Sequence, residues 1–266
     1  MTRIRVCIGT EPRTRIAAKV LEFSIRRHAR DPDQVDCIPL EGGDWSDAAG
    51  PSGQITGFSL QRWSIPERFD HRGKAIYLDA DQLCRVDLRE LWDLGAGVDD
   101  TDPCVWCTYS NVRWRLRRVE LPETSVMLVD CARARGQILT MAQTARHLGG
   151  SWWGARGRYA DVMHLRYLRP PPAPISSWWN VMDGRRGGLG QFHDPRAKIL
   201  HFTRIRTQPW FDPSHPARDL WEDELKGALD DGIVTAREIS EAGKRFIAPN
   251  SRDRPDGLHP YWMKYG

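Results

Sequence analysis

The stretch KAIYLDADQLCRVDLRELWDL, residues 74–94, passes from an apolar strand pattern to a helical pattern through a pair of carboxylates. Apolar residues lead up to Asp79 and Asp81, which only Ala80 separates, and the pattern after Leu83 is helical. In an extended chain, residues two apart point to the same side, so both carboxylates face one way. Near apolar surface, such like charges repel each other and lose hydration, and something must offset that cost.

Two explanations fit this spacing equally well. A divalent cation would remove the repulsion, and magnesium sites commonly use one or two carboxylates together with the phosphates of a substrate. Alternatively, one aspartate accepts hydrogen bonds from the following turn, and the other is hydrated. The spacing of Asp79 and Asp81 leaves both explanations open.

The rest of the chain favours an α/β fold, because strand-like and helical patterns alternate through its first half. The second half is more irregular and rich in Trp, Arg, Gly and Pro. Ligands of open α/β sheets bind beyond the carboxyl ends of strands, where Gly9, Thr10 and the aspartate pair would lie. Strands are predicted at 3–8, 35–40, 74–78, 103–110, 125–131 and 197–202, and helices at 14–27, 85–94, 132–148 and 217–246.

Composition narrows the class of protein. With 266 residues, 40% of them apolar, the chain has room for one large domain or two smaller ones. There is no run of 18 apolar residues, so we expect no transmembrane helix. The start is too short and polar for a signal peptide, which predicts a cytoplasmic protein and leaves peripheral contact with a membrane open. No nucleic-acid-binding module is evident, so we expect no nucleic-acid partner.

The cysteines favour buried thiols over a metal or redox site. Cys104 and Cys107 form a single C-x-x-C, and a zinc site would need a second ligand pair at matching spacing. Most of the six cysteines fall in apolar, strand-like runs, where a thiol behaves as a small hydrophobe.

The segment AIYLDADQLCRVDLRELWDL resembles the metal-binding segment of glycosyltransferase family 8, which includes glycogenin and bacterial lipopolysaccharide galactosyltransferases. Upstream, GFSLQRWSIPERFDHRGKAIYLDAD keeps the family's polar loop, Arg62 and the IPE run. Downstream, ETSVMLVDC is similar to the family's NSGVMLid strand, and ILHFTRIRTQPW to its iiHf.g..KPW segment. The resemblance covers about residues 3–211 and is strongest at 74–94.

This resemblance implies a GT-A-type nucleotide-binding fold with a mixed central sheet flanked by helices. Residues 1–212 would form the catalytic domain, and residues 213–266 a helical C-terminal extension packed on it. The implied reaction moves a sugar from a nucleotide diphosphate donor, a UDP-sugar, to an acceptor hydroxyl with retention of configuration. The implied acceptor is a glycan, a lipid-linked molecule or a small molecule.

The resemblance also implies the site. Asp79, Asp81 and His201 would hold Mn²⁺ or Mg²⁺, although a histidine at the end of a strand is by itself more often a hydrogen-bonded core residue. Asp161 and Glu123 are the candidates for stabilising the positive sugar centre, and no residue can be assigned as a nucleophile. The donor contacts implied are Gly9, Thr10, Arg62, Ala80, Arg204, Arg206 and Gln208.

Two departures from the family pattern concern the donor site. Gln208 precedes Pro-Trp where the family has a lysine that contacts the diphosphate, so Arg204 or Arg206 would have to supply the positive charge. Glu123 stands where the family usually has asparagine, and Asp161 is the best match to its sugar-binding Asp-Gln pair, without the glutamine.

Two other functions remain open from the sequence. Haloacid-dehalogenase-type phosphatases also use D-x-D at a strand end, but on their first strand and with Thr or Val where this chain has Leu83. The second alternative is a catalytically inactive protein that binds a nucleotide sugar, since Gln208 and Glu123 depart from the pattern.

Overall fold

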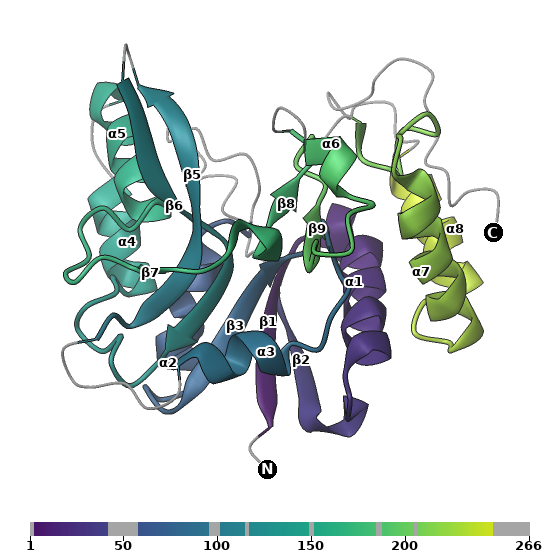
Figure 1. Ribbon diagram of the computed structural model, residues 1–266, viewed down its shortest axis with the longest axis horizontal. Helices are drawn as coiled ribbons and strands as arrows, with labels where there is room; N and C mark the ends of the chain where they lie inside the picture. The colour runs from purple at the N-terminus through teal and green to yellow at the C-terminus, as the bar shows by residue number, and fades with distance from the viewer. Residues whose placement is uncertain are drawn as a thin grey trace. The chain divides into compact units, whose positions relative to one another are not determined.

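Figure 1 shows the protein as a computed structural model that contains both helices and strands. The structure describes residues 3–41, 58–95, 102–114, 117–148, 152–184, 188–204 and 207–246.

Contacts within the chain divide it into two compact units, each built from segments that are distant in sequence. The predicted boundary between residues 212 and 213 stays a prediction. The first unit contains Met1–Pro12, Asp31–Asp79 and Leu88–Trp179, and the second contains Arg13–Arg30, Ala80–Asp87 and Asn180–Gly266.

The first unit is built on a six-stranded mixed sheet with the strand order β2-β1-β3-β6-β5-β7. β1 is parallel to both β2 and β3, and β6 then runs antiparallel to both β3 and β5. The parallel strands β1 and β3 end side by side, with Gly9 opposite Asp79. The strands are β1 Ile4–Thr10, β2 Val35–Glu41, β3 Lys74–Asp79, β5 Val105–Trp114, β6 Arg117–Asp130 and β7 Ala173–Pro174.

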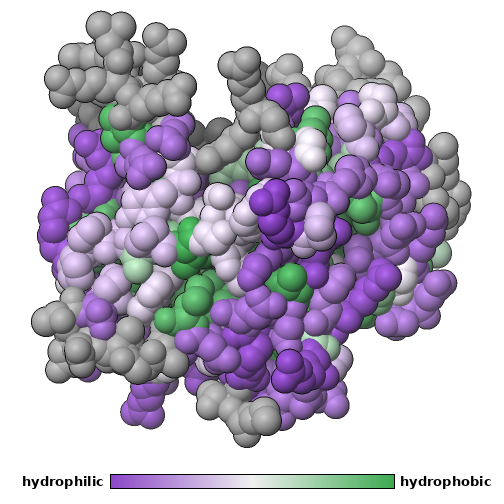
Figure 2. Space-filling view, viewed as in Figure 1, coloured by the Kyte–Doolittle hydropathy of each residue, from purple (hydrophilic) through white to green (hydrophobic). Residues whose placement is uncertain are grey.

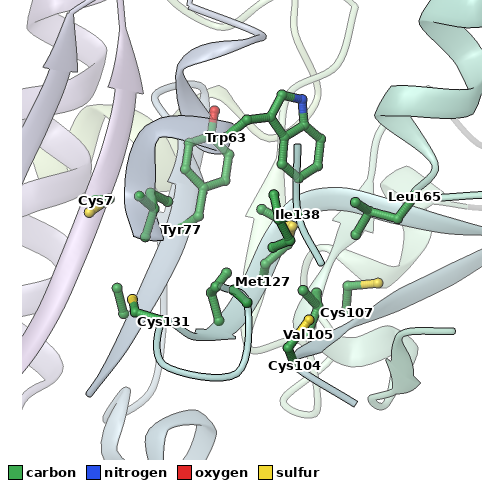
Figure 3. Packing of buried hydrophobic residues seen from close by; sticks show 14 of the residues in the cluster. Cys7, Trp63, Tyr77, Cys104, Val105, Cys107, Met127, Cys131, Ile138 and Leu165 are labelled. Carbon is green, nitrogen blue, oxygen red and sulfur yellow. The ribbon is translucent and has the colours of Figure 1, made fainter. Parts of the chain in front are cut away.

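The core of this unit lies where the sheet meets the segments around residues 60–65 and 134–168. Figure 3 shows Trp63, Tyr77, Met127 and Ile138 packed together there, with several buried cysteines nearby. Burial raises the pKa of the Cys7 thiol to about 12, which makes it an inert hydrophobe as predicted. The helices of this unit are α2 Ile65–Arg68, α3 Arg89–Trp92, α4 Met141–Leu148 and α5 Trp152–Met163.

The second unit contains a small sheet with the order β4-β9-β8, in which β9 is antiparallel to β4 and parallel to β8. Each of these strands has only two or three residues, too few for a recognisable alternation of apolar and polar side chains. They are β4 Gln82–Cys84, β8 Val181–Met182 and β9 Ile199–His201. The helices are α1 Arg15–His28, α6 Gly188–Gln191, α7 Arg218–Asp230 and α8 Ala236–Phe246.

Close packing joins α1 to its neighbours in the second unit. The predicted apolar stripe of α1 is buried, and Phe23 lies so close to Gly227 of α7 that a Cβ there would be 2.4 Å from the ring. On its other side α1 reaches β4, where Ser24 Oγ accepts a hydrogen bond of 3.0 Å from the backbone N–H of Cys84. Figure 1 shows α1 and α7 side by side.

The predicted α/β architecture is confirmed, and the helix at 14–27 and five of the six predicted strands are found with shifts of at most four residues at an end. The sixth strand, predicted at 125–131, begins eight residues earlier as β6. The helix predicted at 85–94 is shortened to α3, and the one predicted at 217–246 is divided into α7 and α8. The helix predicted at 132–148 was wrong in its first half, where the chain makes turns and Gly136 has a φ of +74°. Helix α5 and the short strands β4 and β8 were not predicted. Short 3₁₀ helices cover Pro12–Thr14, Pro32–Gln34, Gln61–Ser64, Asp93–Gly95 and Ser177–Trp179.

The surface in Figure 2 is mainly hydrophilic, with small hydrophobic areas scattered over it. Leu94 is the large hydrophobic residue that stands out as exposed in the described part of the chain. No described helix combines the length and apolar character needed to cross a membrane.

Candidate active site

Asp81 and His201 are brought together by the pairing of β4 with β9. Gln82 lies opposite His201 in this pair, and the N–H of Phe202 donates a 2.9 Å hydrogen bond to the carbonyl of Asp81. This register places Asp81 Oδ1 3.2 Å from His201 Nε2. The Asp81–His201 pair therefore depends on backbone pairing between segments about 120 residues apart along the chain.

The proton on the His201 ring is located by its other neighbour. His201 Nδ1 lies 3.0 Å from Asn180 Oδ1, an acceptor, so Nδ1 carries the proton and donates it. In the neutral ring, Nε2 then has a lone pair directed toward a carboxylate oxygen. A histidine that ligates a metal commonly has this arrangement, in which one nitrogen donates to a fixed acceptor and the other binds the ion.

Asp81 Oδ1 is buried and has no hydrogen-bond partner among the described residues. A buried carboxylate oxygen without a donor is costly, and a facing lone pair on Nε2 does not relieve that cost. A divalent cation binds both kinds of atom, carboxylate oxygen and neutral imidazole nitrogen. Asp81 and His201 therefore fit a divalent cation.

Gln208 holds the second oxygen of Asp81. Its Nε2 donates a 3.0 Å hydrogen bond to Asp81 Oδ2 and a 2.8 Å hydrogen bond to the carbonyl of Phe202. Gln208 is only 3% exposed, so water does not compete for these bonds. Both N–H groups of its amide are thus committed to the protein, and contact of Gln208 with a diphosphate stays a prediction.

Asp79 has its own set of donors in the first unit. Its Oδ1 accepts a 2.6 Å hydrogen bond from Tyr77 Oη and a 2.9 Å hydrogen bond from Arg62 NH2. Tyr77 lies two residues before Asp79 on β3, so both side chains emerge on the same face of the sheet. The carboxylate of Asp79 is therefore fixed in orientation and partly neutralised.

Arg62 is buried and uses all three guanidinium nitrogens within the first unit. Nε donates to the carbonyl of Ser59, and NH1 donates to Thr124 Oγ1, at 2.8 Å in each case. Its guanidinium also lies over the Tyr77 ring, 4.6 Å from the centroid. Burial is the largest single influence and would lower the pKa of Arg62, but Asp79, Tyr77 and Tyr159 together raise it above its ordinary value. Contact between Arg62 and a diphosphate stays a prediction.

Gly9 has a packing reason to be glycine. A Cβ at this position would lie 2.2 Å from Tyr77 Oη and 2.8 Å from the Phe58 ring. Thr10, the next residue, is buried, and its hydroxyl is 3.5 Å from the carbonyl of Glu11. The glycine thus makes room for the tyrosine that holds Asp79, and nucleoside contacts by Gly9 and Thr10 stay predictions.

The two predicted catalytic acids lie in the first unit. Asp161 on α5 is 42% exposed and forms a 2.9 Å ion pair with Arg166. Glu123 lies on β6 opposite Thr108, beside an irregularity of the β5–β6 ladder, and accepts a short hydrogen bond from Ser110. The catalytic roles of Asp161 and Glu123 stay predictions.

The remaining predicted donor contacts differ in their surroundings. Ala80 is fully buried and connects the Asp79 strand to Asp81. Arg204 is exposed, and its carbonyl accepts a 2.8 Å hydrogen bond from the N–H of Thr207 in a turn. Arg206 lies outside the described residues.

Sequence reasoning missed the residues that orient the candidate ligands. These are Asn180 beside His201, and Tyr77 with Thr124 around the Arg62–Asp79 pair. Among these residues, only Tyr77 could have been found from the sequence. It lies two residues before Asp79 in a predicted strand, so its hydroxyl and the Asp79 carboxylate are on the same face of the sheet.

No family model matches the chain. A curated relative, "Protein CDI" of Arabidopsis thaliana, is 24% identical over 252 residues, which cover 84% of this chain and 86% of that protein.

Solved structures match more extensively. The galactosyltransferase LgtC, solved with donor and acceptor sugar analogues, superposes with a TM-score of 0.59 and 13% identity over 87% of this chain and 100% of LgtC. The glycosyltransferase GlyE of Streptococcus pneumoniae superposes with a TM-score of 0.61 and 15% sequence identity over 87% of this chain. The bifunctional glycosyltransferase WbbM superposes with a TM-score of 0.61 and 14% sequence identity over 92% of this chain.

The chain has the GT-A glycosyltransferase fold. It spans 52% of the WbbM chain and 63% of the GlyE chain, so those proteins contain further parts that it does not match. The GT-A fold predicted from the sequence is confirmed, and the neighbours that carry it are glycosyltransferases.

Proposed function

We propose that this GT-A protein transfers a sugar from a nucleotide diphosphate donor, a UDP-sugar, to an acceptor hydroxyl in a reaction that needs a divalent cation. The observation that carries the proposal is the Asp81–His201 pair, in which a buried carboxylate oxygen without a hydrogen-bond partner in the described chain lies 3.2 Å from Nε2 of an oriented imidazole. The fold supports the same class of reaction, because LgtC was solved with donor and acceptor sugar analogues.

Asp79, Asp81 and His201 would hold the cation, Mn²⁺ or Mg²⁺, with two carboxylates and one imidazole. Asp79 and Asp81 are separated by one residue, which keeps their carboxylates near each other whatever the arrangement of the two units. A bound cation would neutralise the charge that develops on the departing diphosphate.

The chain's own residues would bind and orient the donor. Gly9 and Thr10 would lie near the nucleoside, Ala80 near the cation, and Arg204 or Arg206 would supply the positive charge for the diphosphate. Asp161 and Glu123 remain candidates for stabilising the sugar, and retention of configuration is part of the proposal. Much of the rate gain would come from holding donor and acceptor in reacting position.

The acceptor is a hydroxyl compound of unassigned class, and a cytoplasmic location stays a prediction. A haloacid-dehalogenase-type phosphatase is not favoured, because the aspartate pair lies at the end of β3 in a GT-A fold. An inactive protein that binds a nucleotide sugar is the alternative that an experiment must separate from the transferase.

Release of nucleoside diphosphate from a panel of nucleotide sugars with Mn²⁺ tests the proposal. We expect release from one donor, its loss with EDTA, and its loss in Asp81→Ala. Asp231→Ala, an exposed change at the end of α7, should leave release unchanged. Metal-dependent donor binding without release would favour the inactive protein, and the absence of both across the panel would reject the proposal.

A further inference from the structure

We infer that Gln208 is a positioning residue for the metal site: its amide fixes the Asp81 carboxylate so that Oδ1, and not Oδ2, faces His201. The inference rests on the proposed function, because it assigns Gln208 to the cation held there. It gives this glutamine a role different from donor contact.

The first observation is a closed set of three hydrogen bonds around Asp81. The carbonyl of Asp81 accepts from the N–H of Phe202 at 2.9 Å, and the carbonyl of Phe202 accepts from Gln208 Nε2 at 2.8 Å. The same Nε2 then donates to Asp81 Oδ2 at 3.0 Å. The Gln208 amide thereby ties the side chain of Asp81 to the backbone pair that carries the site.

The chemistry of these partners determines how the amide is oriented. Asp81 Oδ2 and the Phe202 carbonyl are both acceptors, so only the NH₂ end of Gln208 can face them. Two protons meet two acceptors, which leaves no N–H of Gln208 for a phosphate. An amide also adds no charge beside the carboxylate, so Asp81 keeps its full negative charge for a cation.

A fixed carboxylate matters because the ligand atom must point at the ion before the ion arrives. Without this bond, the Asp81 side chain could rotate about its torsions. Orientations that turn Oδ1 away from the ion would lower the affinity for the cation. Partners that hold ligating side chains typically contribute about 10- to 100-fold in metal affinity. We expect a loss in this range when Gln208 can no longer donate.

The test measures Mn²⁺ binding by electron paramagnetic resonance on the full chain, without donor, so that it does not depend on turnover. Gln208→Met keeps the size of the side chain and removes both N–H groups. Gln208→Asn keeps the amide but shortens its reach. Both variants should weaken Mn²⁺ binding by about 10- to 100-fold, with Gln208→Met the weaker binder.

Ser24→Ala is the matched control, because it also removes two buried hydrogen bonds in the same unit, one to Leu21 and one from Cys84 of β4, without touching Asp81 or His201. It should lose thermal stability and keep the affinity for Mn²⁺. Thermal unfolding of all variants separates loss of stability from loss of binding.

The outcomes distinguish the two proposals. A wild-type protein that binds no Mn²⁺ would overturn the metal site and this role together. Mn²⁺ binding by the wild type that is unchanged in folded Gln208→Met would overturn the positioning role alone. If neither Gln208 variant folds while Ser24→Ala does, Gln208 belongs to the stability of the unit, and the positioning role is rejected.

Discussion

Asp81 Oδ1 and His201 Nε2 lie 3.2 Å apart, and on its other side His201 Nδ1 lies 3.0 Å from Asn180 Oδ1. With a neutral His201 and no cation, the contact sets the Nε2 lone pair against a carboxylate oxygen, which is unfavourable. With a cation bound, both atoms would become ligands. We therefore expect one substitution, Asp81→Asn, to weaken metal binding and to raise the stability of the metal-free protein.

Asp81→Asn should stabilise the metal-free protein and abolish its response to Mn²⁺. The new amide can donate to His201 Nε2 while its oxygen still accepts from Gln208, which adds a hydrogen bond of about 1 kcal/mol. Thermal unfolding in EDTA should show the variant more stable than wild type. With Mn²⁺ at 100 times its Kd, the wild type should gain about 2.7 kcal/mol and the variant nothing. Lower stability of the variant in EDTA would instead indicate a protonated His201 paired with Asp81.

Arg62→Met should be strongly destabilising, because it leaves the buried carboxylate of Asp79 without its cationic partner. Breaking a buried ion pair from one side typically costs about 3–5 kcal/mol. Urea unfolding measures the loss. Arg3→Met is the control, since Arg3 is 61% exposed in its pair with Asp36, and a surface pair contributes about 0–1 kcal/mol. Equal losses in the two variants would show that the Arg62–Asp79 pair is not stabilising.

Gly9→Ala should destabilise the first unit by about 1–3 kcal/mol, the usual range for overpacking a core. The added methyl group meets Tyr77 Oη at 2.2 Å, so the hydroxyl that holds Asp79 must move. Removing that hydroxyl with Tyr77→Phe should make the double variant less unstable than the two single losses added together. Gly190→Ala, where a Cβ meets nothing within 4 Å, is the control and should be close to neutral. Strict additivity at Gly9 and Tyr77 would contradict the proposed clash.

Glu224→Gln should stabilise the protein at neutral pH. Burial raises the pKa of Glu224 above its ordinary value of 4.5, despite the opposing effect of Arg27 and His28, and Oε2 has no hydrogen-bond partner in the described chain. The folded state therefore holds the proton to higher pH than the unfolded state, and stability falls as pH rises through the folded pKa.

Urea unfolding at pH 5 and pH 8 checks the Glu224 prediction. The advantage of Glu224→Gln over wild type should be larger at pH 8. Glu241→Gln, an exposed change on α8, should show little difference between the two pH values. An equal advantage of Glu224→Gln at both values would mean that the carboxyl of Glu224 is not strained by burial.

Some of these features follow from local patterns in the sequence. β3 was predicted because its residues are continuously apolar up to the aspartate pair, and α1 because its apolar residues recur at helical spacing. The resemblance at 74–94 then gave the GT-A fold, which the solved structures confirm. The turns at 132–137 were mistaken for helix, because a helical spacing of side chains does not report a left-handed backbone at Gly136.

The sequence alone determined which residues can bind a cation or a diphosphate, because charge and donor type belong to the side chain itself. Tertiary structure decided how those side chains are oriented. The contact of Asp81 with Gln208 joins residues 127 apart, through strands of two or three residues that carry no periodic signal. The proton position on His201 and the fixed carboxylate of Asp81 depend on hydrogen bonds between distant segments, which form only when backbone pairing brings those segments together.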